Sequence, residues 1–448
     1  MGAGPDIAGG RRAAAEYAEA FGELKPPLNH SSALVEASRC YFCYDAPCVE
    51  ACPTGIDIPS FIRKIETGNV KGAALDILEP NIFGGACARV CPVETLCEQA
   101  RVREAQEGKP VAIGLLQRHA TDLFLETGEQ PFARAASSGR RAAVIGAGPA
   151  GLSAAHRLSR LGHDVTVFEA RDKPGGLNEY GIAAYKVPND FAQREAAFIL
   201  GLGGIEIEYG KALGKEISLT RLRQDFGAVF IGVGQAAVRA LDAEGHGLAG
   251  IEPAVAYIAR LRQADDVAAL PVGRRIIVIG GGNTAVDIAV QTKRLGAEDV
   301  TIVYRRGPDA MSATGHEQDL AQTDGVRIRH WAQPKRFAGE AGRVSAVEFE
   351  RTEPGAGGRA QGTGETYTLD ADMVFTAIGQ VLLADPLEDG AAESLTVEGG
   401  CIAVDGDMAT SLPGVYAGGD CVAGQDLTVQ AVEDGKRAAL AMDKYLRS

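Results

Sequence analysis

The chain has 448 residues, a net charge of −14 and an apolar fraction of 46%. This length exceeds what a single hydrophobic core supports, so we expect several compact domains. An excess of 59 Asp and Glu over 45 Lys and Arg argues against a nucleic acid or an anionic membrane as partner. The sequence shows no secretory signal and no run of about 18 apolar residues, so we expect a cytoplasmic location.

Residues 1–135 are rich in helix formers and hold a dense group of cysteines, which predicts a helical metal-binding domain. Seven of the nine cysteines lie between Cys40 and Cys97. Clustering of this kind in a reducing compartment indicates metal binding rather than disulfides. The two blocks are Cys40-x2-Cys43-x4-Cys48-x3-Cys52-Pro and Cys87-x3-Cys91-Pro-x4-Cys97.

Two kinds of metal site are compatible with these thiolates. A structural zinc ion takes four tetrahedral ligands, whereas seven cysteines with two Cys-Pro pairs are more typical of one or two [4Fe–4S] clusters. We therefore expect iron–sulfur clusters whose ligands cross between the blocks, although spacing alone does not assign each cysteine to a cluster. Cys401 and Cys421 lie far away in sequence, and we expect them to be ordinary buried thiols.

After a polar linker, the sequence from Ala142 has the pattern strand, glycine turn, amphipathic helix, strand. The turn carries Gly146, Gly148 and Gly151, and its amides at the start of a helix can bind a pyrophosphate. Glu169 ends the second strand, where a carboxylate can accept a hydrogen bond from a ribose 2′-OH. The pattern predicts a doubly wound parallel sheet that binds FAD.

Near the C-terminus, the segment LPGVYAGGD ends in Asp420 and precedes a helical stretch. In flavoproteins with two dinucleotide-binding domains, such an aspartate closes the FAD site, so we expect this segment to fold back onto the first βαβ unit. The predicted domains are a helical iron–sulfur domain (1–135), the first part of an FAD domain (141–238), an NAD(P) domain (239–367) and the second part of the FAD domain (368–448).

A second βαβ pattern begins at Arg275, and its second strand ends in Arg305 and Arg306 where an NAD-selective site would have Asp or Glu. Guanidinium groups pair well with a 2′-phosphate, which favours NADPH over NADH. The alternative is two solvated arginines after a strand. The glycine turn and the start of the helix consist of Gly280, Gly282, Asn283, Thr284 and Ala285.

Neither nucleotide domain contains a Cys-x-x-Cys pair, so a dithiol of the thioredoxin reductase type is not expected. The cysteine domain is then the exit for electrons. We expect hydride transfer from the nicotinamide to the flavin, followed by single-electron transfer to the clusters.

Together these motifs resemble a known family over nearly the whole chain. They are the two cysteine blocks, VIGAGPAG, KPGG, VIGGGNTA, TAIGQ and VYAGGDC. The chain is similar to the reductase half of dihydropyrimidine dehydrogenase, and the small subunit of glutamate synthase is the nearest alternative. The resemblance implies an α/β protein in which a helical iron–sulfur domain precedes two Rossmann-like domains, one for FAD and one for NAD(P).

The resemblance also implies a partner. That subunit would carry FMN and iron–sulfur clusters and reduce uracil or thymine at the 5,6 double bond, in a complex expected to be a heterotetramer. A glutamate synthase small subunit would instead deliver NADPH electrons for glutamate formation. A third reading is a flavoprotein whose cysteine domain binds zinc and serves only for docking.

The family pattern assigns one cluster to Cys40, Cys43, Cys48 and a fourth cysteine, whose place is occupied here by Arg101. Arginine offers no lone pair to iron, so the fourth ligand is open. Cys87, or a water or hydroxide, could replace it, or the cluster could have three irons or be absent.

The pattern assigns the other cluster to Cys52, Cys91, Cys97 and Gln117. Gln117 favours the dihydropyrimidine dehydrogenase reading, because the glutamate synthase pattern tends to have Glu there. The alternative is an ordinary polar residue on a helix.

Three further positions are implied by the resemblance. Gly176 of the KPGG motif belongs to the FAD site, and Lys186 stands where the family has a basic residue near the flavin. Lys186 could stabilise reduced, anionic FAD; the alternative is a solvated lysine. Glu317 occupies a family position near the nicotinamide ribose, and no other side chain is expected to act in catalysis.

Overall fold

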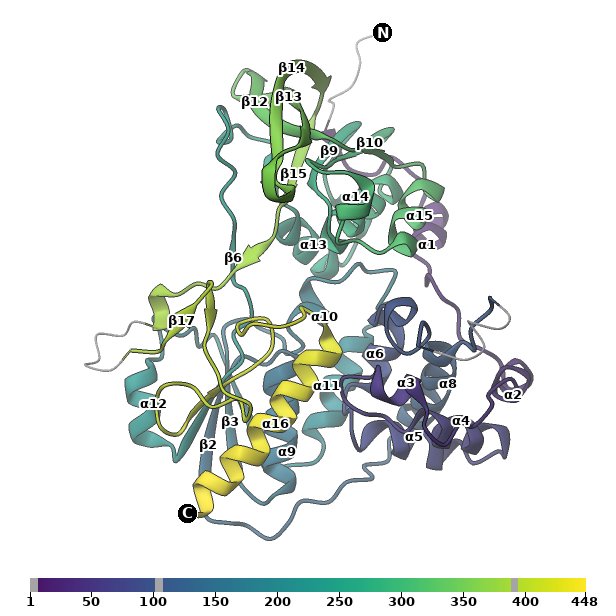
Figure 1. The fold of residues 1–448 in the computed structure, drawn as a ribbon, viewed down its shortest axis with the longest axis vertical. Helices are drawn as coiled ribbons and strands as arrows, with labels where there is room; N and C mark the ends of the chain where they lie inside the picture. The colour runs from purple at the N-terminus through teal and green to yellow at the C-terminus, as the bar shows by residue number, and fades with distance from the viewer. Residues whose placement is uncertain (1–6, 101–107, 388–393) are drawn as a thin grey trace. The chain divides into compact units, whose positions relative to one another are not determined.

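The computed structural model describes residues 7–100, 108–387 and 394–448 (Figure 1). Arg101, which occupies the place of the fourth cysteine in the family pattern, lies outside these residues. Contacts divide the chain into two compact units. Unit 1 comprises the described residues up to Leu24, Tyr180–Pro188 and Val238–Gln380, and unit 2 comprises Lys25–Glu179, Asn189–Ala237 and Val381–Ser448.

The N-terminal part of unit 2 is helical. Helix α4 illustrates why, because Asp57 caps it by accepting a hydrogen bond from the Ser60 amide, and its apolar side chains recur at helical spacing on one buried face. The helices are α2 (His30–Ala37), α3 (Pro47–Glu50), α4 (Ile58–Glu66), α5 (Val70–Leu78), α6 (Gly84–Val90), the 3-10 turn η1 (Val93–Thr95) and α8 (Ile113–Glu126).

A five-stranded parallel sheet follows in unit 2, in the order β19-β5-β2-β3-β4. Its central strands are buried runs of small and β-branched residues, as expected for a sheet covered on both faces. The strands are β2 (Arg141–Ile145), β3 (Asp164–Glu169), β4 (Ile205–Tyr209), β5 (Ala228–Ile231) and β19 (Val415–Ala417). The helices are α9 (Pro149–Arg160), α10 (Leu177–Tyr180), α11 (Phe191–Leu200), α12 (Leu219–Asp225) and α16 (Thr428–Arg447).

The C-terminal segment returns to this sheet. Strand β19 pairs in parallel with β5, and α16, yellow in Figure 1, packs along α9. The Ser153 hydroxyl donates to the Val432 carbonyl at 2.7 Å within this helix pair. Two far-apart stretches of sequence therefore share one sheet and one core.

Unit 1 contains a second parallel sheet, in the order β11-β10-β9-β15-β7. Its strands are β7 (Ile251–Pro253), β9 (Arg275–Gly280), β10 (Asp299–Val303), β11 (Arg327–Arg329) and β15 (Met373–Ala377). The helices are α1 (Ala14–Ala20), α13 (Ala254–Gln263), α14 (Asn283–Arg294) and α15 (Gly315–Thr323), with 3-10 turns η2 (Val267–Ala269) and η3 (Pro308–Ala310). The prediction of two doubly wound sheets after a helical region is thus confirmed.

Unit 1 also carries an antiparallel sheet that the sequence did not suggest. Its strands are β12 (Ala332–Glu340), β13 (Arg343–Pro354) and β14 (Ala360–Asp370).

The remaining elements of the two units are short. The short strands are β1 (Ile7–Ala8), β6 (Ala237–Val238), β8 (Val272–Gly273), β16 (Gln380–Val381), β17 (Val397–Glu398) and β18 (Cys401–Ile402), and the remaining 3-10 turns are η4 (Ala356–Gly358) and η5 (Asp385–Leu387). No helix in the described part of the chain is both long and apolar enough to cross a bilayer.

Candidate functional site: two dinucleotide cradles and a cysteine domain

The first glycine turn in unit 2 is a backbone cradle that no side chain could enter. Gly146 has φ +97°, and a Cβ there would lie 2.4 Å from the Gly232 carbonyl oxygen. A Cβ on Gly151 would lie 1.9 Å from the Gly146 oxygen. Gly148 is the N-cap residue of α9 and has no side chain that could accept a hydrogen bond from the first turn. The first backbone amides of α9 can therefore donate to a ligand. Free amides at the start of a helix suit the pyrophosphate of FAD.

Glu169 lies at the end of β3, and its buried carboxylate stabilises this turn through hydrogen bonds. It accepts hydrogen bonds from the amides of Ala147 at 2.7 Å and Arg171 at 2.8 Å. The expected role toward a ribose hydroxyl uses the same carboxylate, whose oxygens each have a second lone pair. Gly176 has φ +54°, and its Cβ would lie 2.8 Å from the Gly148 Cα, so KPGG passes directly over the turn.

Asp420 follows β19 in the same unit and is partly buried. Burial, with Asp426 and Asp434 nearby, raises the pKa of this carboxyl to about 6. The Gln235 side-chain amide donates to the Asp420 carbonyl oxygen at 3.0 Å. Asp434 of α16, which the sequence did not single out, accepts from the Gly419 amide at 3.0 Å and so holds the turn that carries Asp420.

The second glycine turn, in unit 1, repeats the first. Gly280 has φ +147°, and its Cβ would lie 2.1 Å from the Ala377 oxygen, while a Cβ on Gly281 would strike the Tyr304 ring at 2.5 Å. Gly282 is the N-cap of α14. The residues that follow are Asn283, which is exposed, Thr284, which is half-buried, and Ala285, which is buried.

The two arginines after β10 lie at the surface of unit 1. Arg305 is exposed, and Arg306 is half-buried with its Nε donating to the Tyr304 hydroxyl at 3.0 Å. The single tryptophan, Trp331, packs on Gly307 and donates its backbone N–H to the Arg306 carbonyl. The loop is therefore anchored while the guanidinium of Arg305 stays accessible.

Lys186 is not a solvated lysine. Its side chain is 9% exposed, and its Nζ forms ion pairs of 2.7 Å with both Asp287 of α14 and Glu317 of α15, all within unit 1. Burial acts to lower the pKa of Lys186, but the two carboxylates outweigh it and raise the pKa above its ordinary value. Lys186 and Glu317, two separate predictions, thus belong to one cluster, and Asp287 is a third member that the sequence did not reveal.

Seven of the cysteines in unit 2 form two groups. Cys40, Cys43 and Cys48 line one apolar cavity with Ile58 and Ile62. No group of three or more His, Cys, Asp or Glu side chains among the described residues is arranged to hold a single metal ion. A [4Fe–4S] cluster differs in that each thiolate binds a separate iron atom.

The second group contains Cys52, Cys87, Cys91 and Cys97. A hydrogen bond with the Cys87 thiol, burial, and the charges of Cys87, Cys97 and Cys52 raise the pKa of Cys91 well above its ordinary value. Cys91 ends α6, and Cys87 lies one turn earlier on the same helix. Cys87 therefore lies with this second group, next to Cys91.

Gln117 is buried on α8, and its amide nitrogen donates to the Gly84 carbonyl at 2.7 Å. The nitrogen is engaged, and the oxygen is the atom of this side chain with lone pairs for iron. The two remaining cysteines lie outside both groups: Cys401 is half-buried in β18, and burial raises the pKa of Cys421 to about 12.

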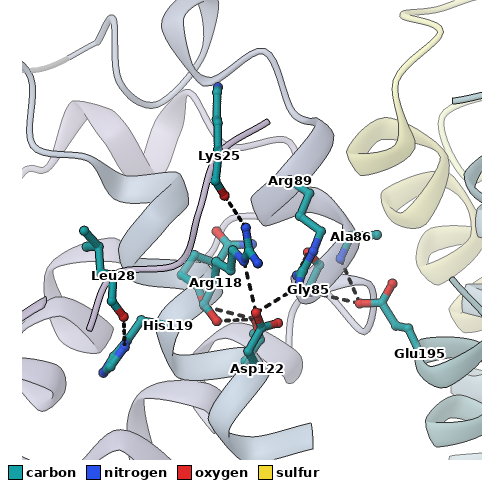
Figure 2. A network of polar contacts seen from close by, with 11 residues as sticks. Lys25, Leu28, Gly85, Ala86, Arg89, Arg118, His119, Asp122 and Glu195 are labelled. Atoms are coloured by element: carbon teal, nitrogen blue, oxygen red, sulfur yellow. Dashed lines mark hydrogen bonds and ion pairs between the residues drawn. The ribbon is translucent and has the colours of Figure 1, made fainter. Parts of the chain in front are cut away.

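A buried polar network around α6 was missed at the sequence level (Figure 2). Asp122 of α8 lies between Arg89 and Arg118, at 2.8 and 3.0 Å, and Glu195 of α11 accepts from the amides of Gly85 and Ala86. The sequence contained one sign of this network. Glu195 lies one helical turn from both Phe191 and Ile199, so it is a charged residue on the apolar face of its helix.

Comparison with known proteins shows the family of this chain. The model of the pyridine nucleotide-disulphide oxidoreductases matches residues 140–435, and that of dihydropyrimidine dehydrogenase domain II, 4Fe-4S cluster, matches residues 17–129. The NAD-dependent dihydropyrimidine dehydrogenase subunit PreT of Salmonella typhimurium is 35% identical over 95% of this chain and 97% of its own. This chain belongs to the PreT family.

Other relatives share the architecture. The PreT subunit of Escherichia coli K12 is also 35% identical over 95% of this chain and 97% of its own. The glutamate synthase [NADPH] small chain of the same organism is 32% identical over 95% of this chain and 94% of its own. PreT-family membership therefore extends over both the cysteine domain and the nucleotide domains.

Solved structures agree on the fold. Mycobacterium tuberculosis FprA in complex with NADPH superposes with a TM-score of 0.59 at 20% identity, over 69% of this chain and 84% of that one. Lactococcus lactis thioredoxin reductase gives 0.54 at 24% identity, over 69% and 99%. The two family matches and the PreT relatives show that this is an NAD(P)H-oxidising flavin and iron–sulfur protein that binds FAD, a nicotinamide nucleotide and iron–sulfur of the [4Fe–4S] type. The expectation of iron–sulfur rather than zinc is confirmed.

Proposed function

We propose that this chain is the reductase subunit of a dihydropyrimidine dehydrogenase. It would oxidise NAD(P)H and pass the electrons to an FMN-bearing partner that reduces uracil or thymine at the 5,6 double bond, within a heterotetramer. The observation that supports this most strongly is the 35% identity to PreT subunits across 97% of their length. We include in this proposal the predicted domain boundaries and the roles of individual site residues.

When bound, FAD accepts a hydride from the nicotinamide and releases electrons singly to the clusters. The task of this chain is to bind and orient these groups. Gly146, Gly148 and Gly151 leave amides at the start of α9 for the FAD pyrophosphate, Glu169 accepts from the ribose, and Asp420 closes the site from the C-terminal segment.

The start of α14 would hold the nicotinamide nucleotide in the same way. Arg305 and Arg306 supply two positive charges beside this turn, and these favour NADPH through its 2′-phosphate. Lys186, positioned by Asp287 and Glu317, would be the basic residue that the family has near the flavin.

In the cysteine domain, we assign Cys52, Cys91, Cys97 and Gln117 to one cluster. Cys40, Cys43 and Cys48 would hold three corners of the other. Its fourth ligand would come from solvent, because Cys87, the candidate substitute, lies beside Cys91. A labile iron at that corner follows from this assignment.

The proposal is tested with the purified chain and with its complex. Alone, the chain should reduce an artificial acceptor with NAD(P)H and leave uracil untouched. A complex copurified from the native host should reduce uracil or thymine, assayed separately with NADH and NADPH. Turnover of uracil by the chain alone would refute the division of labour.

A glutamate synthase small chain is the second candidate, because that relative is 32% identical over 94% of its length. The partner distinguishes the two readings. Copurification of a glutaminase-bearing subunit, with glutamate formation from NADPH, would replace the pyrimidine assignment while leaving the electron path within this chain unchanged.

A further inference from the structure

Glu195 is a buried carboxyl that contacts the cluster-bearing helix. Its side chain is 1% exposed and extends from α11 to the first turn of α6 (Figure 2). Both hydrogen bonds, from the amides of Gly85 at 2.9 Å and Ala86 at 3.0 Å, end on Oε1. Oε2 is buried with no hydrogen-bond partner among the described residues. The two amides therefore stabilise Oε1 alone, and no donor stabilises a negative charge on Oε2.

One peptide group connects Glu195 to Gln117. The nitrogen of the Gly84–Gly85 peptide donates to Glu195, and the carbonyl oxygen of the same peptide accepts from the Gln117 amide at 2.7 Å. Hydrogen bonds in such a chain polarise one another, especially in a buried environment. A change of charge at one end of this chain is therefore felt at the other.

The glycines are required for this approach. A Cβ on Gly85 would lie 2.5 Å from Cζ of Phe191 and 2.9 Å from Oε1 of Glu195, and a Cβ on Gly84 would lie 2.5 Å from Cγ2 of Ile77. No other residue type lets the carboxyl and the backbone come this close. The contact is therefore built into the packing of α11 against α6.

Few charges face this carboxyl. On α6 it meets Arg89, whose guanidinium is paired with Asp122 of α8 and lies 3.6 Å from the centre of the Phe191 ring. Burial raises the pKa of Glu195 to about 8, against the lowering effects of the two amides and Arg89.

Helix α9 also packs on α11. Burial lowers the pKa of His156 on α9 to about 3, so this histidine is neutral from pH 7 to 10. The two arginines of that helix, Arg157 and Arg160, pair with Glu79.

We propose that Glu195 is a redox-linked proton acceptor for the cluster assigned to Cys52, Cys91, Cys97 and Gln117. The inference rests on that part of the proposed function. At a pH where Glu195 is ionised in the oxidised protein, each electron that enters, supplied by NAD(P)H oxidation, draws up to one proton from solvent to Oε2, and the carboxylate becomes a carboxylic acid. No bond to iron forms or breaks.

The direction in which the midpoint potential changes with pH, and the pH range of that change, follow from the charges. An added electron near Glu195 disfavours the carboxylate, so the pKa in the reduced state lies above the value of about 8. Below about pH 8 Glu195 is protonated in both states, and the midpoint potential of the cluster is independent of pH. Above this value the potential falls by up to about 59 mV per pH unit, the one-electron equivalent of a tenfold change.

The experiment is an EPR-monitored redox titration of the purified full chain at several pH values from 7 to 10. Glu195→Gln is the neutral mimic, and we expect it to keep the low-pH potential of the wild type at every pH. Asp443→Asn is the matched control. Hydrogen bonds from Arg447 and His163 outweigh burial and lower the pKa of Asp443, so it stays ionised throughout. We expect this control to keep the wild-type slope.

Two results would overturn the proposal: a flat potential in the wild type above pH 8, or a Glu195→Gln protein that retains the wild-type slope. If Glu195→Gln does not fold, redox-difference infrared spectra of the wild type at pH 9 decide instead. A carboxylic acid band that appears on reduction supports the proposal, and its absence refutes it. Failure of uracil reduction with a partner leaves these results unaffected, whereas a chain without iron and sulfide would overturn both.

Discussion

Replacing Lys186 by Met tests whether its buried ion pairs organise unit 1. The substitution keeps much of the apolar stem but leaves Asp287, 8% exposed, and Glu317, 16% exposed, as neighbouring carboxylates without a cation. Removal of one partner from a buried ion pair costs about 3–5 kcal/mol. For a unit of this size, that loss corresponds to a decrease in Tm of about 6–20 °C.

The pH of the measurement is chosen from the way in which the contribution of Lys186 to stability depends on pH. The pKa of Lys186 is raised in the folded chain, so its contribution is complete at any pH below the ordinary value of about 10.4 and is lost only as the pH rises above it. Calorimetric unfolding of the full chain at pH 7 therefore reports the whole effect.

Arg336→Met is the control for this measurement. The Arg336–Glu348 pair lies in the same unit at 3.3 Å, with side chains 52% and 26% exposed, and such a surface pair is worth at most about 1 kcal/mol. A triple variant, Lys186→Met with Asp287→Asn and Glu317→Gln, should recover part of the lost stability because no charge remains unpaired. Equal shifts for Lys186→Met and Arg336→Met would show that the buried cluster has no special role.

Three further predictions concern cofactor binding. Gly151→Ala should abolish retention of FAD, seen as loss of flavin absorbance, because its Cβ would lie 1.9 Å from a carbonyl oxygen, whereas Gly247→Ala, with nothing within 4 Å, should retain the flavin. Arg306→Ala should raise KM for NADPH about 10- to 100-fold, the effect of losing a charged hydrogen bond, and leave KM for NADH nearly unchanged; equal effects on both would refute a 2′-phosphate contact. Wild-type protein should lose FAD more readily as the pH falls through about 6, where Asp420 becomes protonated, and Asp420→Asn should remove that pH dependence when flavin release is followed by fluorescence.

Local patterns predicted much of the fold and of the site. Gly146 and Gly280 both have positive φ, and a Cβ at these positions would lie 2.4 and 2.1 Å from a carbonyl oxygen. Only glycine fits there, so both turns can be recognised from the sequence. The long antiparallel strands β12 and β14 were missed because their exposed, polar surface lacks the apolar alternation that identifies a strand.

Chemistry that depends on neighbours along the chain can be predicted from the sequence: cysteine spacing, glycine turns followed by helices, and the order of the domains. Contacts between distant groups require the folded structure. It placed Cys87 beside Cys91, Lys186 between two carboxylates, and Glu195 against the amides of α6. The physical reason is that burial makes an unpaired charge or polar group costly, so its partner is set by three-dimensional packing and leaves no periodic signal in the chain.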